Sequence, residues 1–145
     1  MIRIICLGKI KEIYLKNAVE DYLKRVSKYH KIEIIELKDD ENILKEENQL
    51  LKYLDSKDLN IALDIKGKKF NSPLLAELID KAFNSFPRIN FIIGSSNGLS
   101  SKVKNLCQEQ ISFGDITMPH GLFRVVLLEQ IYRAFKINNN ESYHK

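Results

Sequence analysis

The chain has 145 residues, of which 44% are hydrophobic and 29% are charged, as is typical of one globular domain, here residues 1–145. After the N-terminal segment, its longest uninterrupted apolar stretch, Val125 to Leu128, is far shorter than the ~20 residues of a membrane-spanning helix, and no signal peptide is recognisable, so we expect a soluble, cytoplasmic protein without membrane contact. The net charge is only +4, so the distribution of charge is more informative than its sum.

The first half of the chain alternates strand and helix patterns. A β-branched run predicts a strand at Ile2–Leu7, closed by Gly8, and helical apolar spacing predicts a helix at Ile13–Val26. Alternating Ile and Glu predict an edge strand at Ile32–Leu37. A weaker helix is expected at Ile43–Leu54.

The second half continues this alternation. Ser72, Pro73 and Glu77 supply capping chemistry at the start of a helix. The expected elements are a strand at Asn60–Ile65 ended by Gly67, a helix at Pro73–Phe86, a strand at Asn90–Ile93, a helix at Ser100–Gln108, a strand at Ile111–Phe113 and a long helix at Pro119–Ile137.

This order predicts an α/β fold with a mainly parallel sheet of five or six strands and helices on both faces. Ligands of such sheets bind at the carboxyl ends of the strands. Gly8, Gly67, Gly94 and Gly114 each follow a predicted strand. They indicate either tight turns or a pocket lined by backbone.

The two cysteines lie in apolar runs. Cys6 falls in a predicted strand and Cys107 in a predicted helix, with no CxxC and no histidine at zinc spacing. We therefore expect reduced, buried thiols and no bound metal.

Charge is segregated along the chain. Residues 1–31 carry eight basic and three acidic side chains, residues 32–65 four and ten, and residues 66–104 seven and two. The two basic segments fit an anionic partner such as RNA if they share a surface. Solvated lysines on helix faces give the same counts.

The segment Phe91–Leu99 is a buried strand followed by a Gly-rich loop. It lacks both G-x-G-x-x-G and G-x-x-x-x-G-K-[ST], so neither a dinucleotide-binding fold nor a phosphate-loop NTPase is supported. Such a loop can hold an uncharged or zwitterionic ligand through backbone groups.

A second polar loop, residues 113–119, leads into the last helix. His120 would lie at the positive end of the helix dipole, where a neutral imidazole can accept a proton. The alternative is an exposed histidine without a role.

The last helix is apolar over most of its circumference. Glu129, Gln130, Arg133 and Lys136 form one narrow polar stripe, so the remaining surface indicates a second subunit. Arg124 lies on the apolar side, where it would form either a buried ion pair or a contact with a substrate phosphate.

The C-terminal tail ends in Tyr143, His144 and Lys145. Its composition is typical of a frayed end. A ring, a titratable base and a cation in succession could also hold an RNA base.

Several blocks of the sequence together resemble one family, the bacterial ribosomal RNA large subunit methyltransferase H family. The blocks are GKIKE at Gly8–Glu12, LDIKGK at Leu63–Lys68, IIGSSNG at Ile92–Gly98, MPHxxxRV at Met118–Val125, EQIYRAF at Glu129–Phe135 and the terminal YHK. The resemblance implies a minimal SPOUT domain with a C-terminal trefoil knot that acts as a homodimer. It further implies transfer of a methyl group from S-adenosylmethionine, without a metal, to N3 of a pseudouridine (position ~1915) in a 23S rRNA stem-loop, in the context of the ribosome.

The resemblance also implies which residues form the site. The cofactor pocket would comprise Leu63, Gly94, Phe113, Gly114, Asp115, Ile116, Thr117 and Met118. The catalytic residues would be His120, Arg124, Arg133, Tyr143 and His144, with Glu129 and Lys145 binding substrate. Ser95 stands where the family usually has a second glycine.

Proton removal from N3 could fall to His120, His144 or Tyr143, while Arg124 and Arg133 would hold phosphates or the developing base anion. The competing interpretation is a non-enzymatic, flavodoxin-like module that binds a nucleotide or RNA. Such a module has no need for the residue 113–120 loop together with the YHK end.

Overall fold

The computed structural model describes residues 1–145 as five strands and five helices in alternation. All strand pairs are parallel, and the sheet has the order β2-β1-β4-β3-β5, which confirms the predicted α/β class. The strands are β1 (Ile2–Leu7), β2 (Ile32–Leu37), β3 (Leu59–Lys69), β4 (Ile89–Ile93) and β5 (Glu109–Ser112). The helices are α1 (Ile13–Ser27), α2 (Ile43–Leu51), α3 (Ser72–Ser85), α4 (Ser101–Leu106) and α5 (His120–Asn138).

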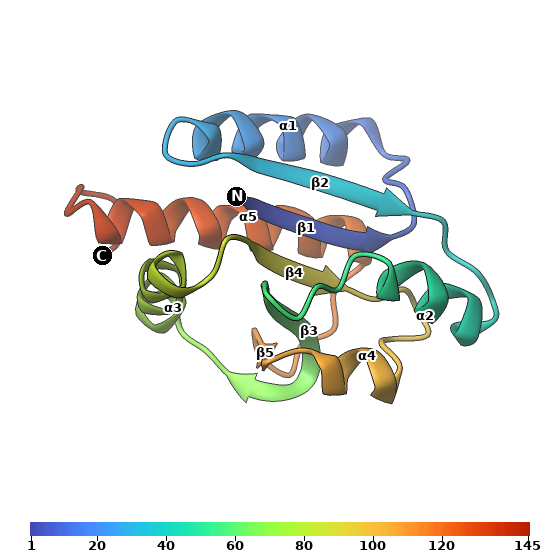
Figure 1. The fold of residues 1–145 in the computed structure, drawn as a ribbon. Coiled ribbons are helices and arrows are strands. Elements are labelled where there is room, and N and C mark those ends of the chain that lie inside the picture. The colour runs from blue at the N-terminus through green and yellow to red at the C-terminus, as the bar shows by residue number, and fades with distance from the viewer.

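The strand order explains why helices cover both faces of the sheet. The β1–β2 and β3–β4 crossovers run toward one edge, whereas β2–β3 and β4–β5 run toward the other. Because crossovers between parallel strands are nearly always right-handed, opposite directions place the helices on opposite faces. Accordingly α1 and α3 pack on one face and α2 and α4 on the other (Figure 1).

The sheet separates two apolar cores of unequal size. Alternate residues of β1 face opposite sides, so Ile4 contributes to the larger core and Ile5 to the smaller. Helix α5 crosses the larger core between α1 and α3. The apolar surface of α5, from which the sequence indicates a second subunit, is thus largely covered by its own chain.

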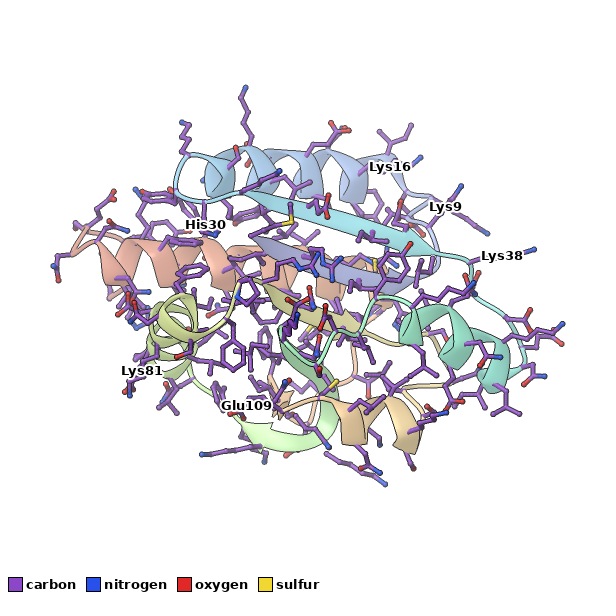
Figure 2. The ribbon with its side chains drawn as sticks, viewed as in Figure 1. Lys9, Lys16, His30, Lys38, Lys81 and Glu109 are labelled. Atoms are coloured by element: carbon purple, nitrogen blue, oxygen red, sulfur yellow. The ribbon has the colours of Figure 1, made fainter.

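His30 closes one end of the larger core. It follows α1 and packs its ring against Phe83 of α3 and Phe135 of α5, with centroid distances of 4.2 and 6.2 Å (Figure 2). Its Nε2 is buried without a hydrogen-bond partner. Burial, with a smaller contribution from the N-terminal ammonium, lowers the pKa of His30.

A buried polar network lies at the end of the sheet where the strands begin. Arg3 Nε donates to Asn90 Oδ1 at 2.8 Å, and Asn90 Nδ2 donates to Asp58 Oδ2 at 3.0 Å. Arg88 pairs with the same carboxylate at 3.0 Å. These residues thus satisfy one another's hydrogen-bonding groups at this end of the sheet.

Strand β3 is longer than its sequence pattern predicts. The prediction that Gly67 ends the strand is wrong: Leu63 and Lys68 both pair with Ile111, so residues 64–67 bulge out and the strand continues to Lys69. A Cβ on Gly67 would lie 2.7 Å from the Gln110 carbonyl carbon. Glycine is therefore required at this position because any side chain would collide with the backbone of β5, and not because the chain turns here.

Two helix starts also differ in detail. Asn71, rather than Ser72, caps α3 by accepting a hydrogen bond from the Leu74 amide, while the Ser72 hydroxyl donates to Gln130 Oε1. Pro119 occupies the position just before α5.

None of the helices is both long and apolar enough to span a membrane.

The two thiols are buried and free, as predicted. Burial raises the pKa of Cys6 and of Cys107 to about 11, so both stay protonated at neutral pH.

The C-terminal knot stays a prediction.

Candidate active site

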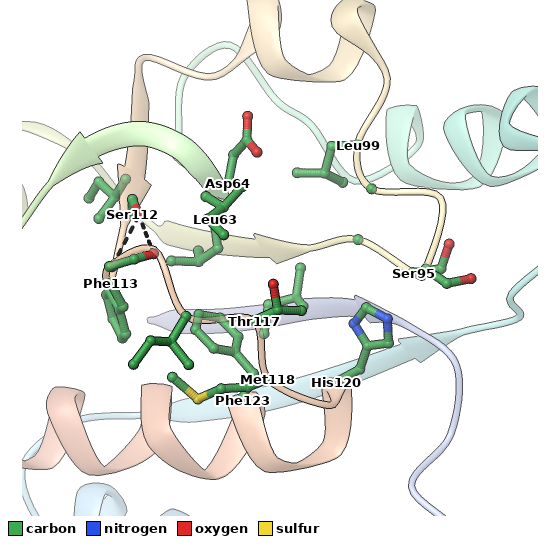
Figure 3. A pocket seen from close by; sticks show the side chains of 18 residues that line it. Leu63, Asp64, Ser95, Leu99, Ser112, Phe113, Thr117, Met118, His120 and Phe123 are labelled. Carbon is green, nitrogen blue, oxygen red and sulfur yellow. Dashed lines mark hydrogen bonds between the residues drawn. The ribbon is translucent and has the colours of Figure 1, made fainter.

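A cavity of about 470 Å³ opens at the carboxyl ends of β3, β4 and β5 (Figure 3). From β3 the chain first turns to β4 and then crosses back past β3 to β5. Such a reversal separates the following loops and leaves a crevice between them. The cavity thus lies where the parallel fold is expected to bind a ligand.

Most of the residues that the sequence assigns to the cofactor pocket line this cavity. They are Leu63, Gly94, Phe113, Gly114, Ile116, Thr117 and Met118. Asp115 does not line it, because its exposed carboxylate points to Lys69 and pairs with it at 2.8 Å. Ile65, on the β3 bulge, and Phe123 are further lining residues that the sequence did not indicate.

The loop after β4 folds back on itself. Gly98 N–H donates to the Ser95 carbonyl at 2.9 Å, and the two residues form an isolated antiparallel bridge. A Cβ on Gly94 would lie 2.7 Å from the Gly98 carbonyl carbon, which is closer than two carbon atoms that are not bonded to each other can approach. The glycine therefore permits the backbone of this loop to form one side of the cavity.

The loop after β5 forms the opposite side. The Ser112 hydroxyl donates to the Gly114 carbonyl at 3.0 Å and accepts from the Gly114 amide at 3.1 Å. Gly114 has a φ of +124°, which side chains rarely allow. Phe113 packs on Phe123 with a centroid distance of 5.4 Å, so an aromatic pair supports the apolar wall.

His120 lies at the mouth of the cavity as the first residue of α5. Its side chain is exposed and comes close to the Ser95 side of the opening (Figure 3). Phe123 follows one helical turn later and lines the same cavity. The i, i+3 spacing, which places both on one helix face, is the signal that could have identified Phe123.

Arg124 does not line this cavity and is instead 98% buried beneath the end of β1. Its guanidinium pairs with Glu36 at 2.8 Å and donates to the carbonyls of Leu7 and Gly8 at 3.1 and 2.8 Å. Its Nε has no partner. Of the two alternatives for this residue, the structure shows the buried ion pair.

The remaining predicted residues cluster at the far end of α5. Arg133 pairs with Glu129 at 2.8 Å, lies over the Tyr143 ring at 4.6 Å and approaches His144 Nδ1 at 3.1 Å. Lys145 is exposed. The hydrogen bond with Glu129 raises the pKa of Arg133, and burial, followed by the hydrogen bond to Glu129, raises the pKa of Tyr143.

The tail is held in place, so its interpretation as a frayed end is wrong. Asn140 adopts the left-handed conformation, with φ of +54°. Its amide donates to the Ile137 carbonyl at 3.1 Å, and the Glu141 amide donates to the Lys136 carbonyl at 2.9 Å. This Schellman arrangement turns the chain back along α5.

The cavity and the tail cluster lie at opposite ends of α5. Arg133 lies thirteen positions after His120 on α5, or about 20 Å at ~1.5 Å per residue. Figure 1 shows the C-terminus at the edge where the strands begin. One chain thus brings His120 to the cavity but does not bring Tyr143 or His144 to it.

The cavity is suited to a ligand with both flat apolar and polar parts. Leu63, Ile93 and Phe123 provide apolar surface, while the loops offer backbone groups. No heavy atom lies within 4 Å of the position that a Cβ on Gly98 or Gly114 would take. No cluster of three or more potential metal-ligating side chains is present.

The comparisons with known proteins agree with this arrangement. Residues 1–144 match a family described as "Predicted SPOUT methyltransferase". The chain is 48% identical to the ribosomal RNA large subunit methyltransferase H of Oenococcus oeni, covering 99% of this chain and 98% of the relative, and 46% identical to that of Streptococcus uberis, covering 99% of each. It shares the fold of a probable methylase family protein from Haemophilus influenzae, with a TM-score of 0.58 at 10% identity over 96% of this chain and 66% of that one.

Proposed function

The chain belongs to the SPOUT methyltransferase family and is a ribosomal RNA methyltransferase, and we propose that its target is N3 of a pseudouridine in a 23S rRNA stem-loop. The relatives are matched from end to end. We further propose that the substrate is the folded RNA in the ribosome, near position ~1915, and that the protein acts in the cytoplasm.

The observation that supports methyl transfer by this chain is the cavity with its backbone-lined loops, whereas the proposed target rests on the family resemblance. Its volume of about 470 Å³ lies within the ~300–1,000 Å³ usual for cofactor pockets. S-adenosylmethionine combines a flat purine with a zwitterionic amino-acid part, and the apolar walls and the glycine loops, which leave room for close approach to the backbone, fit both. Leu63, Gly94 and the loop from Phe113 to Met118 would hold it.

When bound, S-adenosylmethionine supplies an electrophilic methyl group on a positively charged sulfur. The residues of the protein must then orient the N3 nitrogen in line with that methyl group and remove the N3 proton. His120 lies at the mouth of the cavity and is the candidate proton acceptor within the same chain. Tyr143 and His144 are candidates from a second chain.

A homodimer would bring the two clusters together. Within one chain the tail cluster is about 20 Å from His120, measured along α5. In a dimer with a twofold axis, each protomer places its tail against its partner in the same way, so both cavities would receive the tail of the other chain. In such a dimer Arg133, Tyr143 and Lys145 would face the RNA bound over the neighbouring cavity.

Incubating the protein with methyl-labelled S-adenosylmethionine and bacterial large subunits lacking this modification tests the proposal. Label in 23S rRNA that maps to N3 of one pseudouridine is the expected result. Label at another nucleotide would contradict the proposed target. Intact cofactor binding without any label would instead favour the non-enzymatic binding module.

Single replacements separate the candidate proton acceptors. His120→Ala, Tyr143→Phe and His144→Ala are compared at saturating cofactor. Loss of the acceptor should reduce turnover by ~10²–10⁴-fold. A variant with normal turnover has not lost the base.

A further inference from the structure

We infer that Glu46 is a positioning residue whose buried carboxylate holds the Gly94–Gly98 loop in the shape that binds the cofactor. The inference rests on the proposed function, because it takes this loop to be part of the cofactor site. Glu46 is on α2 and lies outside the cavity, so it acts on the cofactor only through the loop.

Glu46 is almost completely buried, with 1% of its surface exposed. The Ser95 hydroxyl donates to its Oε1 at 2.7 Å, and Asn97 Nδ2 donates to the same oxygen at 3.1 Å. The other oxygen, Oε2, accepts from the Asp40 amide at 3.0 Å. Two of its three donors therefore come from the loop.

No lysine, arginine or histidine lies within ion-pair distance of the Glu46 carboxylate. A buried carboxylate without a counter-ion depends on its hydrogen-bond donors for stabilisation. Its donors Ser95 and Asn97 are consequently confined to positions within reach of α2. The loop cannot move away from α2 without leaving this charge unsatisfied.

Ser95 connects this anchor with the internal structure of the loop. While its hydroxyl donates to Glu46, the same oxygen accepts from the Asn97 amide at 3.2 Å. Its backbone carbonyl accepts from Gly98 N–H at 2.9 Å. The Ser95 side chain therefore links Glu46 to the hydrogen bonds that shape the loop.

The loop has two sides with different roles. Its backbone at Gly94 and Gly98 lines the cavity, whereas the Ser95 and Asn97 side chains are directed to α2 and to the residues before it. Fixing the outer side sets the position of the inner side, because Gly94 already contacts Gly98. The anchor therefore preorganises backbone groups for the cofactor.

The test compares Glu46→Gln with the wild type by titration calorimetry with S-adenosylmethionine and by hydrogen exchange of the cofactor-free protein. The introduced carboxamide has one acceptor oxygen and cannot accept from all three donors, so we expect about tenfold weaker cofactor binding and faster exchange in residues 94–99. At saturating cofactor, kcat and the KM for ribosomal subunits should be unchanged. Glu77→Gln removes one exposed carboxylate on α3 and should change none of these quantities.

Asn97→Ala is the second variant and removes only one exposed side chain of the loop. If Glu46→Gln does not fold, Asn97→Ala alone tests whether the hydrogen bond between Glu46 and the loop holds the loop in place. If both variants fold, the double variant should lose less cofactor affinity than the sum of the two single losses. Unchanged affinity and exchange in the folded variants would overturn the inference, as would faster exchange throughout the sheet or a fall in kcat at saturation.

These outcomes are distinguishable from failure of the proposed function. If the wild type binds no S-adenosylmethionine, the proposed function is wrong. Exchange of residues 94–99 in the cofactor-free variants still shows whether Glu46 holds the loop. If the wild type binds it and the variants bind equally well, only the inference about Glu46 is wrong.

Discussion

Gly94 is the residue at which the cavity depends most directly on the absence of a side chain. A Cβ would lie 2.7 Å from the Gly98 carbonyl carbon. The position of the Cβ is fixed by the backbone of residue 94 and the carbonyl carbon is itself backbone, so no side-chain rotation can relieve the contact. Gly94→Ala should therefore displace the loop and weaken S-adenosylmethionine binding at least tenfold, about 1.4 kcal/mol. Calorimetric titration measures this.

Gly121→Ala is the matched control for that substitution. The added methyl would meet the flexible end of Leu15 at 2.9 Å, which can move. Near-normal cofactor affinity is expected for this variant. Equal weakening by both substitutions would show that any added methyl near the site has the same effect.

The two arginines of α5 should respond differently to replacement. Arg124 is buried and donates to Glu36 and to two backbone carbonyls, so Arg124→Ala should lower the free energy of unfolding by ~1–3 kcal/mol, because these acceptors lose their donor. Arg133 is partly exposed, so Arg133→Ala should leave urea unfolding almost unchanged and reduce methyl transfer. A stable but inactive Arg124 variant would restore Arg124 to the catalytic residues.

Residue identity and chain order were sufficient to predict a ligand site at the loops that contain Gly94 and Gly114, whereas the cofactor residues around Gly94 and Phe113 were implied by the family resemblance. The predicted strands end directly before these loops, and the ends of parallel strands meet at one edge. Glu46 could not be predicted in this way, because it meets Ser95 only through the packing of α2 on the sheet. Asp115 was assigned to the pocket by its place in a run of lining residues, but exposed carboxylates pair with any nearby lysine.

Among the elements, the junction of α1, α3 and α5 should give the protein a pH-dependent stability. The pKa of His30 is lowered by burial, so the folded state binds fewer protons than the unfolded state between the lowered value and the ordinary ~6.5. The free energy of unfolding should therefore have its full value above pH ~6.5 and should decrease as the pH falls below this value.

Urea unfolding at pH 7.5 and pH 5.5 measures this effect. His30→Phe keeps a ring against Phe83 and removes the titrating group, so it should reduce the difference between the two midpoints. The N-terminal ammonium is the other charge that acts on this ring. An unchanged difference in the variant would assign the pH dependence to other groups.

The end of α5 depends on one residue in the left-handed conformation. At Asn140, with φ of +54°, alanine should cost ~1–2 kcal/mol in that conformation, whereas glycine adopts it freely. Asn140→Ala should therefore speed hydrogen exchange in residues 141–145, and Asn140→Gly should not. Equal exchange in both would show that side-chain contacts of the tail, such as that of Tyr143 with Glu129, hold it without the left-handed turn.

The central parts of the elements were predictable and their ends were not. Apolar periodicity and β-branched runs depend on local sequence, so β1, β2, α1 and α5 were predicted to within about two residues. The extension of β3 through Gly67 depends on pairing with β5, which is distant in sequence. The tail was predicted to fray from composition alone, whereas its order comes from contacts with α5 and with Tyr29.

For the molecule as a whole, alternation of elements predicts a parallel sheet but not its strand order. The order β2-β1-β4-β3-β5 decides which loops meet, and with it the cavity between the ends of β4, β3 and β5. The apolar circumference of α5 predicts a partner subunit, yet α1 and α3 of the same chain cover much of it. If Tyr143 or His144 acts at the cavity, as proposed, a second chain must supply it.

A mixing experiment tests most directly whether two chains share each site. One variant carries Gly94→Ala, which impairs the cavity, and the other lacks residues 143–145, which removes the tail; each alone should have little methyl transfer activity. After subunit exchange, half of the dimers combine an intact cavity with an intact tail from the partner, so we predict recovery of about a quarter of the wild-type rate. No recovery, although mixed dimers form, would contradict the account.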